Sequence, residues 1–185
     1  MKRNVLIGIA GALVLGALAT GAAISAQDRY TVKVPGGLAF SEFKGYESWQ
    51  TISISHNGGL LAVILGNPTM IEAYKAGIPE NGKPFPDGAK MAKIHWSAKK
   101  NETAPGQPLV AGALHDVDLM VKDSKRFADS GGWGYGEFEY EAASDSFRPG
   151  NTADQPPQGN DAKCGAVCHT AAKTRDFVFT EFPKR

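Results

Sequence analysis

Alternation of apolar and polar residues indicates that this chain is built mainly from β-strands. Neighbouring side chains on a strand point to opposite faces of the sheet, so a period of two marks a strand with one buried face. The clearest case is 137–141, where Phe138 and Tyr140 alternate with glutamates. This alternation, together with continuous apolar runs, predicts strands over 31–34, 51–55, 60–65, 89–96, 109–121 and 137–141, and a short edge strand over 177–179.

Helical signals are few and short. Asn67 is suited to cap a helix that has Pro68 in its first turn and runs to about residue 75, before Gly77. Thr69 and Glu72 offer an alternative capping box, which would start the helix two residues later. Shorter helical turns are predicted within 40–49, over 124–128 behind a capping Asp123, and over 166–173.

The fold class follows from the length and composition of these segments. A helical bundle needs long runs with a 3.6-residue period, and a chain with 22 glycines and 11 prolines shows none. We therefore predict a mainly β (α+β) domain with a few short helices.

The first 26 residues have the features of a secretory signal peptide. Lys2 and Arg3 precede an apolar run over 5–19, and small residues follow to Ala26. The run is short for a membrane span, although an uncleaved anchor is the alternative. Either reading places the folded part outside the cytoplasm, and we expect a periplasmic protein with a single domain over 27–185.

The charge of the chain narrows the choice of partners. The formal net charge is +1, and loss of Lys2 and Arg3 with the leader would make it −1. Proteins that bind nucleic acids or anionic membrane surfaces need an excess of basic residues. The near-neutral balance argues against both.

The most specific chemical signal is the segment Cys164-Gly165-Ala166-Val167-Cys168-His169. Two cysteines followed directly by a histidine are typical of covalent haem attachment, in which the thiols bond to the vinyl groups and the histidine coordinates iron. The usual spacer has two residues, whereas this one has three. A disulfide between the cysteines stays open, as does a zinc site whose fourth ligand would be His56, His95 or His115. The first reading makes the sheet and helices a shell around one haem.

A long polar segment over 142–163 precedes this motif and contains few apolar residues. A loop of this length in a small domain is usually either functional or disordered. Its position indicates that it wraps toward the edge of the haem.

Several short segments, taken in order along the chain, resemble the cytochrome P460 and cytochrome c′-β family. They are Gly45 to Trp49, Gly66-Asn67-Pro68, Phe85-Pro86-Asp87-Gly88 with Lys93 five residues on, 121–127, Gly132-Trp133-Gly134 and Cys164 to His169. The resemblance covers nearly the whole chain after the leader. It implies an antiparallel β fold, commonly as a homodimer, that holds one covalently attached haem c with a vacant iron position.

The resemblance also implies roles for four residues. Cys164 and Cys168 would form the thioether bonds, and His169 would be the proximal iron ligand. Lys93 falls where members that oxidise hydroxylamine carry a lysine bonded to the porphyrin rim, although by periodicity alone it would be a solvated lysine on a strand. Those members also carry a distal arginine, which would lie near the aliphatic residues 60–62 here.

Three functions fit an iron site of this kind. The first is a periplasmic enzyme that oxidises hydroxylamine and passes electrons to a soluble redox cytochrome. The second is a protein that binds nitric oxide or similar small ligands without turnover. The third is an electron carrier with a sixth iron ligand, for which the candidates are Met70, Met91, Met120 and His95.

Turnover would also require a base that accepts protons. The candidates are Glu137, Glu139, Glu141, Asp118, Asp123 and His95. Each has an ordinary structural role as well: the glutamates form one face of an alternating strand, Asp123 is suited to cap a helix, and histidines are common at surfaces. The sequence therefore leaves the catalytic base unassigned.

Overall fold

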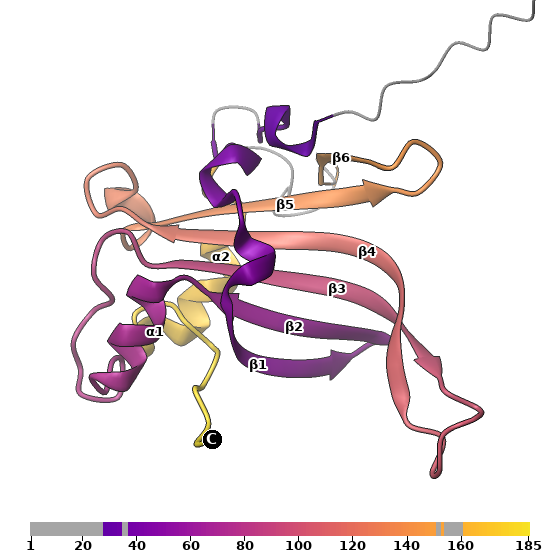
Figure 1. Cartoon of the computed structure of the whole chain (residues 1–185). Helices are drawn as coiled ribbons and strands as arrows, with labels where there is room; N and C mark the ends of the chain where they lie inside the picture. The colour runs from indigo at the N-terminus through magenta and orange to yellow at the C-terminus, as the bar shows by residue number, and fades with distance from the viewer. Residues whose placement is uncertain (1–27, 35–36, 151–152, 154–160) are drawn as a thin grey trace, which may run out of the picture.

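One antiparallel sheet of six strands forms the centre of the fold, with neighbours in chain order from β1 to β6 (Figure 1). The strands are β1 (Gln50–Asn57), β2 (Leu60–Gly66), β3 (Lys90–Lys100), β4 (Leu109–Lys122), β5 (Trp133–Glu141) and β6 (Ser146–Pro149). Adjacent strands are consecutive in the chain, which is the topology of a meander. The prediction of a mainly β fold with an antiparallel sheet is confirmed.

This computed structural model describes residues 28–34, 37–150, 153 and 161–185. The predicted signal peptide at 1–26 and part of the loop before Cys164 lie outside the described residues. Within the described part, no helix has the length and apolar character needed to cross a membrane.

Seven short helices accompany the sheet in the described part of the chain. They are η1 (Arg29–Thr31), η2 (Phe40–Phe43), η3 (Tyr46–Ser48), α1 (Pro68–Lys75), η4 (Ala128–Ser130), α2 (Ala166–His169) and η5 (Thr170–Arg175). The helix predicted after Asn67 is confirmed as α1, because the Asn67 side chain accepts the backbone N–H of Met70 at 3.0 Å and Pro68 is the first helical residue. The turns predicted within 40–49 and over 166–173 are also confirmed.

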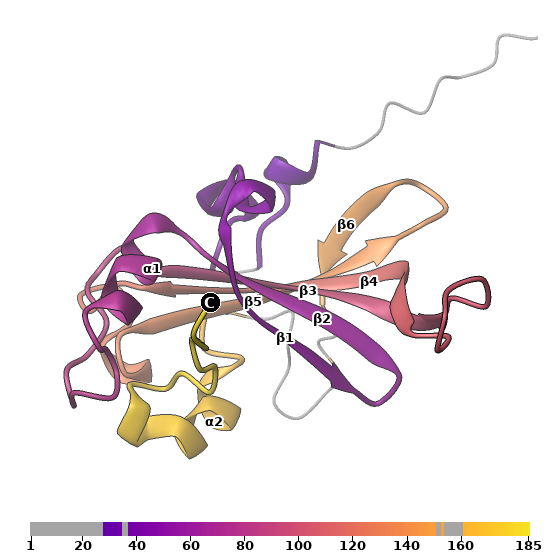
Figure 2. The same ribbon diagram turned by 60° about the horizontal axis from the view of Figure 1, so that its bottom comes forward.

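The two faces of the sheet are covered by opposite ends of the chain. In Figure 2 the N-terminal segment lies on one side of the sheet, and α2 with the C-terminal segment lies on the other. On the N-terminal side, Phe40 and Leu38 are fully buried together with Val117 and Phe138. On the C-terminal side, the core residues include Ile52, Ile64, Met70, Met91, Met120, Trp133, Tyr135, Cys164 and Val178. Cys164 thus belongs to the second core.

The register of the strands determines which side chains share the face of the sheet on the C-terminal side, called the second face below. Lys93 on β3 is paired with Asp118 on β4, which is paired with Glu137 on β5. Side chains of directly paired residues lie on the same face of a sheet. The three charged residues therefore form one row across the sheet, beside a row that contains Met91 and Met120.

Two predicted strands are wrong. Residues 31–34 contribute only an isolated bridge between Lys33 and Ala39, and their alternation reflects the burial of Val32 and Val34 against the sheet. Residues 177–179 form no strand, because the chain turns through left-handed conformations at Asp176 (φ 50°) and Phe177 (φ 65°).

Two further predictions, one of a helix and one of a loop, are corrected as well. The chain forms a turn followed by η4 in place of the helix predicted over 124–128, because the Phe127 carbonyl accepts the N–H groups of Ser130 and Gly132. Asp123 still caps this turn by accepting the N–H of Arg126 at 3.0 Å. The polar segment 142–163, predicted as one loop, contains β6.

Candidate functional site

A cavity of about 580 Å³ lies between the second face of the sheet and the C-terminal segment. Its volume is within the range of small-molecule and cofactor sites. Cys164, Cys168, His169 and Lys93 all line it, although Lys93 is distant from the other three in sequence. The structure thus brings the four predicted cofactor-binding residues together.

The ring of His169 is held by one hydrogen bond and two aromatic contacts. Its Nδ1 lies 2.7 Å from the Phe177 carbonyl oxygen, and its centroid lies 4.8 Å from that of Tyr135 and 5.0 Å from that of Phe179. A carbonyl oxygen only accepts, so Nδ1 carries the proton and donates it. Nε2 is then the nitrogen with a free electron pair for a metal.

The charge state of His169 suits ligation. Burial lowers the pKa of His169, and the positive charge of Lys93 acts in the same direction, while the hydrogen bond to Phe177 opposes both. The neutral imidazole is therefore favoured at neutral pH. This is the form that binds metals.

The two cysteines are free thiols in the structure, with Cys164 buried and Cys168 exposed. Burial raises the pKa of Cys164 to about 12, so this thiol is protonated at neutral pH. None of the three histidines predicted as a fourth zinc ligand, His56, His95 and His115, is among the residues that line the cavity. Neither the disulfide nor the zinc alternative gains support.

Gly165, in the spacer between the cysteines, permits close packing on β5. A Cβ atom at this position would lie 2.6 Å from Cδ1 of Tyr135, which is closer than two carbon atoms can approach. The backbone N–H of Tyr135 also donates to the Ala162 carbonyl at 2.8 Å. These contacts fix the start of the cysteine motif against the sheet.

The cavity offers a set of groups that suits a haem. Two thiols and an imidazole nitrogen provide the attachment and ligation chemistry. Ile64, Met91 and Met120 provide apolar surface. The buried hydroxyl of Tyr135, which also lines the cavity, has no hydrogen-bond partner within the described part of the chain. An unpaired buried hydroxyl is costly, so a polar group of a bound molecule is expected near it.

Two of the six candidate bases line the cavity, and the sequence pattern alone did not separate these two from the other four. Asp118 and Glu137 lie there, in the same row as Lys93, and not on a solvated face. The Asp118 side chain is 42% exposed at the cavity. Desolvation by the surrounding protein raises its pKa to about 6, and the negative charge of Asp116 adds to the effect. Glu139 and Glu141 instead pair with Arg148.

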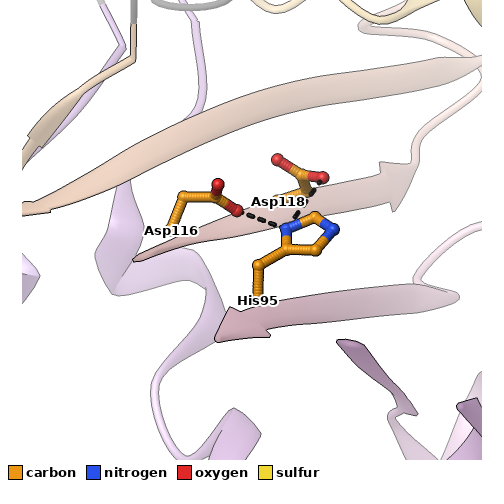
Figure 3. A group of neighbouring side chains, drawn as sticks. All are labelled: His95, Asp116 and Asp118. Atoms are coloured by element: carbon orange, nitrogen blue, oxygen red, sulfur yellow. Dashed lines mark hydrogen bonds and ion pairs between the residues drawn. The ribbon is translucent and has the colours of Figure 1, made fainter. Parts of the chain in front are cut away.

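His95 lies beside the row formed by Lys93, Asp118 and Glu137, in a group with Asp116 and Asp118 (Figure 3). Its Nδ1 is hydrogen-bonded to Asp116 and lies 3.8 Å from Oδ2 of Asp118, and His115 Nδ1 contacts the second oxygen of Asp116 at 2.5 Å. Burial would raise the pKa of Asp116, but the hydrogen bonds from the two histidines hold it below its ordinary value. His95 is therefore engaged by Asp116.

His95, Asp116 and Asp118 offer one nitrogen and two oxygens that lie within 4.8 Å of one another. A cation would compete there with the hydrogen bond from His95 and with Lys93, which is paired with Asp118 in the register of the sheet. We assign no metal to this group.

The methionines and the aliphatic residues at 60–62 are also placed. Met91 and Met120 line the cavity, whereas Met70 is fully buried in the core. Residues 60–62 are not part of the lining, and β1 and β2 contribute Ser53, Ile54, Ser55 and Ile64. The aliphatic character of 60–62 therefore gives no information about the polarity of this cavity.

Comparison with known families adds one finding. A family model described as Cytochrome P460 matches residues 43–180, which include all six strands and every cavity-lining residue named above. No curated protein gives a significant match to the chain.

Proposed function

The chain belongs to the cytochrome P460 family of c-type haem proteins, and from that premise we propose that it is exported to the periplasm, where it binds and oxidises hydroxylamine. The proposal treats residues 1–26 as a signal peptide and 27–185 as one haem domain. A homodimer and a soluble cytochrome as electron acceptor are part of the same proposal.

In this proposal four residues hold one haem. Cys164 and Cys168 form the thioether bonds, and Nε2 of His169 is the protein ligand of the iron. Lys93 lines the same cavity, and a bond from it to the porphyrin rim would make the site one of the hydroxylamine-oxidising type. The packing of Tyr135 and Phe179 against His169 supports a fixed orientation of the imidazole.

The protein's own contribution to turnover is the movement of protons. Bound haem would supply iron, which can bind a small nitrogen ligand and accept electrons from it. Oxidation of hydroxylamine also releases protons, so a base is needed within reach. Asp118 lines the cavity and, with a pKa of about 6, is ionised at pH 7 and readily protonated. Glu137 lies next to it in the register and is a second acceptor.

The observation that carries the proposal is the pairing of Lys93 with Asp118 inside the cavity that contains Cys164, Cys168 and His169. A protein that only binds nitric oxide has no need of a base. The apolar lining by Ile64, Met91 and Met120 favours this gas-binding function as the alternative. An electron carrier would require Met91 or Met120 as a sixth ligand.

One set of measurements on the exported protein separates these functions. We expect a high-spin ferrous spectrum that changes with nitric oxide, and hydroxylamine-dependent reduction of an added electron acceptor. Asp118→Asn should lower this rate, whereas Asp123→Asn, which changes a carboxylate outside the cavity, should not. Ligand binding without any reduction would leave the gas-binding function, and a low-spin spectrum unaffected by carbon monoxide would leave the carrier.

A further inference from the structure

A buried ion pair lies outside the cavity lining and has no part in the function proposed above. The Lys122 ammonium group at the end of β4 contacts both carboxylate oxygens of Asp176, at 2.7 and 2.9 Å, and donates to the Gly131 carbonyl at 3.0 Å. The two side chains are only 6% and 12% exposed. The ammonium group also lies 5.1 Å from the centroid of the Trp133 ring. Its hydrogen-bonding capacity is therefore used up inside the protein.

The same contacts fix the backbone at Asp176 and Phe177. One Asp176 oxygen accepts the backbone N–H of Phe85 at 2.8 Å, so the carboxylate is held from two sides. Both Asp176 and Phe177 have positive φ angles, which is uncommon for residues other than glycine and especially for an aromatic residue. Such a conformation persists only where the surroundings impose it.

Gly131 links the ion pair to Phe177. Its carbonyl accepts from Lys122, and a Cβ atom on it would lie 2.2 Å from Cε2 of Phe177. The Phe177 ring therefore packs directly on the glycine that the ammonium group holds. A closed set of contacts thus runs from Lys122 through Asp176, Phe177 and Gly131 back to Lys122.

The same contacts also reach His169, which is the iron ligand in the proposed function. The carbonyl oxygen that accepts from His169 Nδ1 is that of Phe177. We propose that the Lys122–Asp176 ion pair is a positioning device for His169, because it holds the left-handed turn at 176–177 that aims the Phe177 carbonyl at the imidazole. This inference rests on the proposed role of His169 as proximal ligand.

The expected effect is on the donor strength of the imidazole. A carbonyl that accepts from Nδ1 fixes the tautomer and orientation of a ligating histidine and increases its basicity. Replacing a buried ion pair by apolar residues is often neutral or stabilising, so overall stability alone does not account for this pair. Loss of either charge should release the turn and weaken the hydrogen bond to His169.

The test uses the haem-loaded protein and the iron–histidine stretching band in the resonance Raman spectrum of its ferrous form. Asp176→Asn keeps the shape of the side chain and removes its charge, and Lys122→Met removes the partner charge. Both should shift the band to lower frequency or split it, and Lys122→Arg should restore most of the wild-type position. Arg126→Met is the matched control. It breaks the ion pair between Arg126 and Glu42. Arg126 also donates to the Gly37 carbonyl, so this pair belongs to the N-terminal side of the sheet and not to the turn at 176–177.

Each outcome decides the matter. An unchanged band in Asp176→Asn and Lys122→Met would overturn the inference. So would failure of both variants to fold, judged by circular dichroism, because the pair would then be a general stabilising contact. A wild-type protein that binds haem but lacks any iron–histidine band would instead contradict the proposed role of His169.

Discussion

Lys93 and Asp118 face each other across β3 and β4, and both side chains line the cavity that also contains Cys164, Cys168 and His169. The register places the two residues on the same face of the sheet. Burial raises the pKa of the Asp118 carboxyl group to about 6, and the positive charge of Lys93 opposes this rise. In the proposed function, Asp118 is the proton acceptor within the site where a nitrogen ligand would be oxidised.

Lys93→Ala tests the contact between this row and the cofactor. If Lys93 is bonded to the porphyrin rim, the wild-type ferrous Soret band should be displaced to the red, and the variant should show the ordinary position and lose hydroxylamine turnover while keeping its haem. Lys99→Ala, an exposed lysine on the same strand, is the control and should change neither property. An unchanged spectrum and rate in Lys93→Ala would remove this lysine from the site.

Asp118→Asn tests the base. The carboxyl group is protonated below about pH 6 and cannot accept a proton there, so wild-type turnover should fall as the pH decreases through about 6. The variant should be slower at pH 7 and should lack this acidic limb. A pH–rate profile of both proteins makes the comparison, and an identical limb in the variant would assign it to another group.

The same carboxyl group makes stability depend on pH. Its pKa rises from 3.8 to about 6 on folding, so the folded form binds a proton more tightly than the unfolded form does. The contribution of Asp118 to stability is therefore greatest below pH 3.8 and is lost as the pH rises through about 6. Urea midpoints measured between pH 4 and 7 should show a smaller decline for Asp118→Asn than for the wild type.

Gly165→Ala tests the packing of the cysteine motif on β5. The backbone at Gly165 (φ −77°, ψ −14°) suits alanine, so the only penalty is the contact of the new Cβ with Tyr135. Overpacking of this kind costs about 1–3 kcal/mol. The urea midpoint should fall with an unchanged m-value, and haem attachment should become less efficient. Val167→Ala, at a 67% exposed position in the same spacer, should change stability by less than about 0.5 kcal/mol.

The sequence predicted those features that depend on neighbouring residues. The cap at Asn67 and the turn that carries His169 are local, and both are confirmed. Strands β1 to β5 were predicted from alternation and apolar runs, although β3 extends to Lys100 and β5 begins at Trp133, beyond the predicted ends, and β6 was missed. Both strands are longer than predicted because their ends pair with β4: Lys100 pairs with Leu109, and Trp133 pairs with Lys122.

Features that depend on distant residues were missed. The turn at Asp176 replaced a predicted strand because its carboxylate binds Lys122, which is 54 residues away in the chain. Alternation placed Glu137 on the polar face of its strand without showing that the C-terminal segment covers that face and leaves a cavity. The signal for the site was the row of Lys93, Asp118 and Glu137 across three paired strands. This row can be recognised only when the register of the strands is known.

Mass spectrometry of the denatured, exported protein tests the central claim most directly, because only a covalent cofactor survives denaturation. The account predicts a chain that carries the mass of one haem, with the added mass lost in Cys164→Ser/Cys168→Ser. A bare polypeptide whose two sulfurs are joined to each other would contradict it.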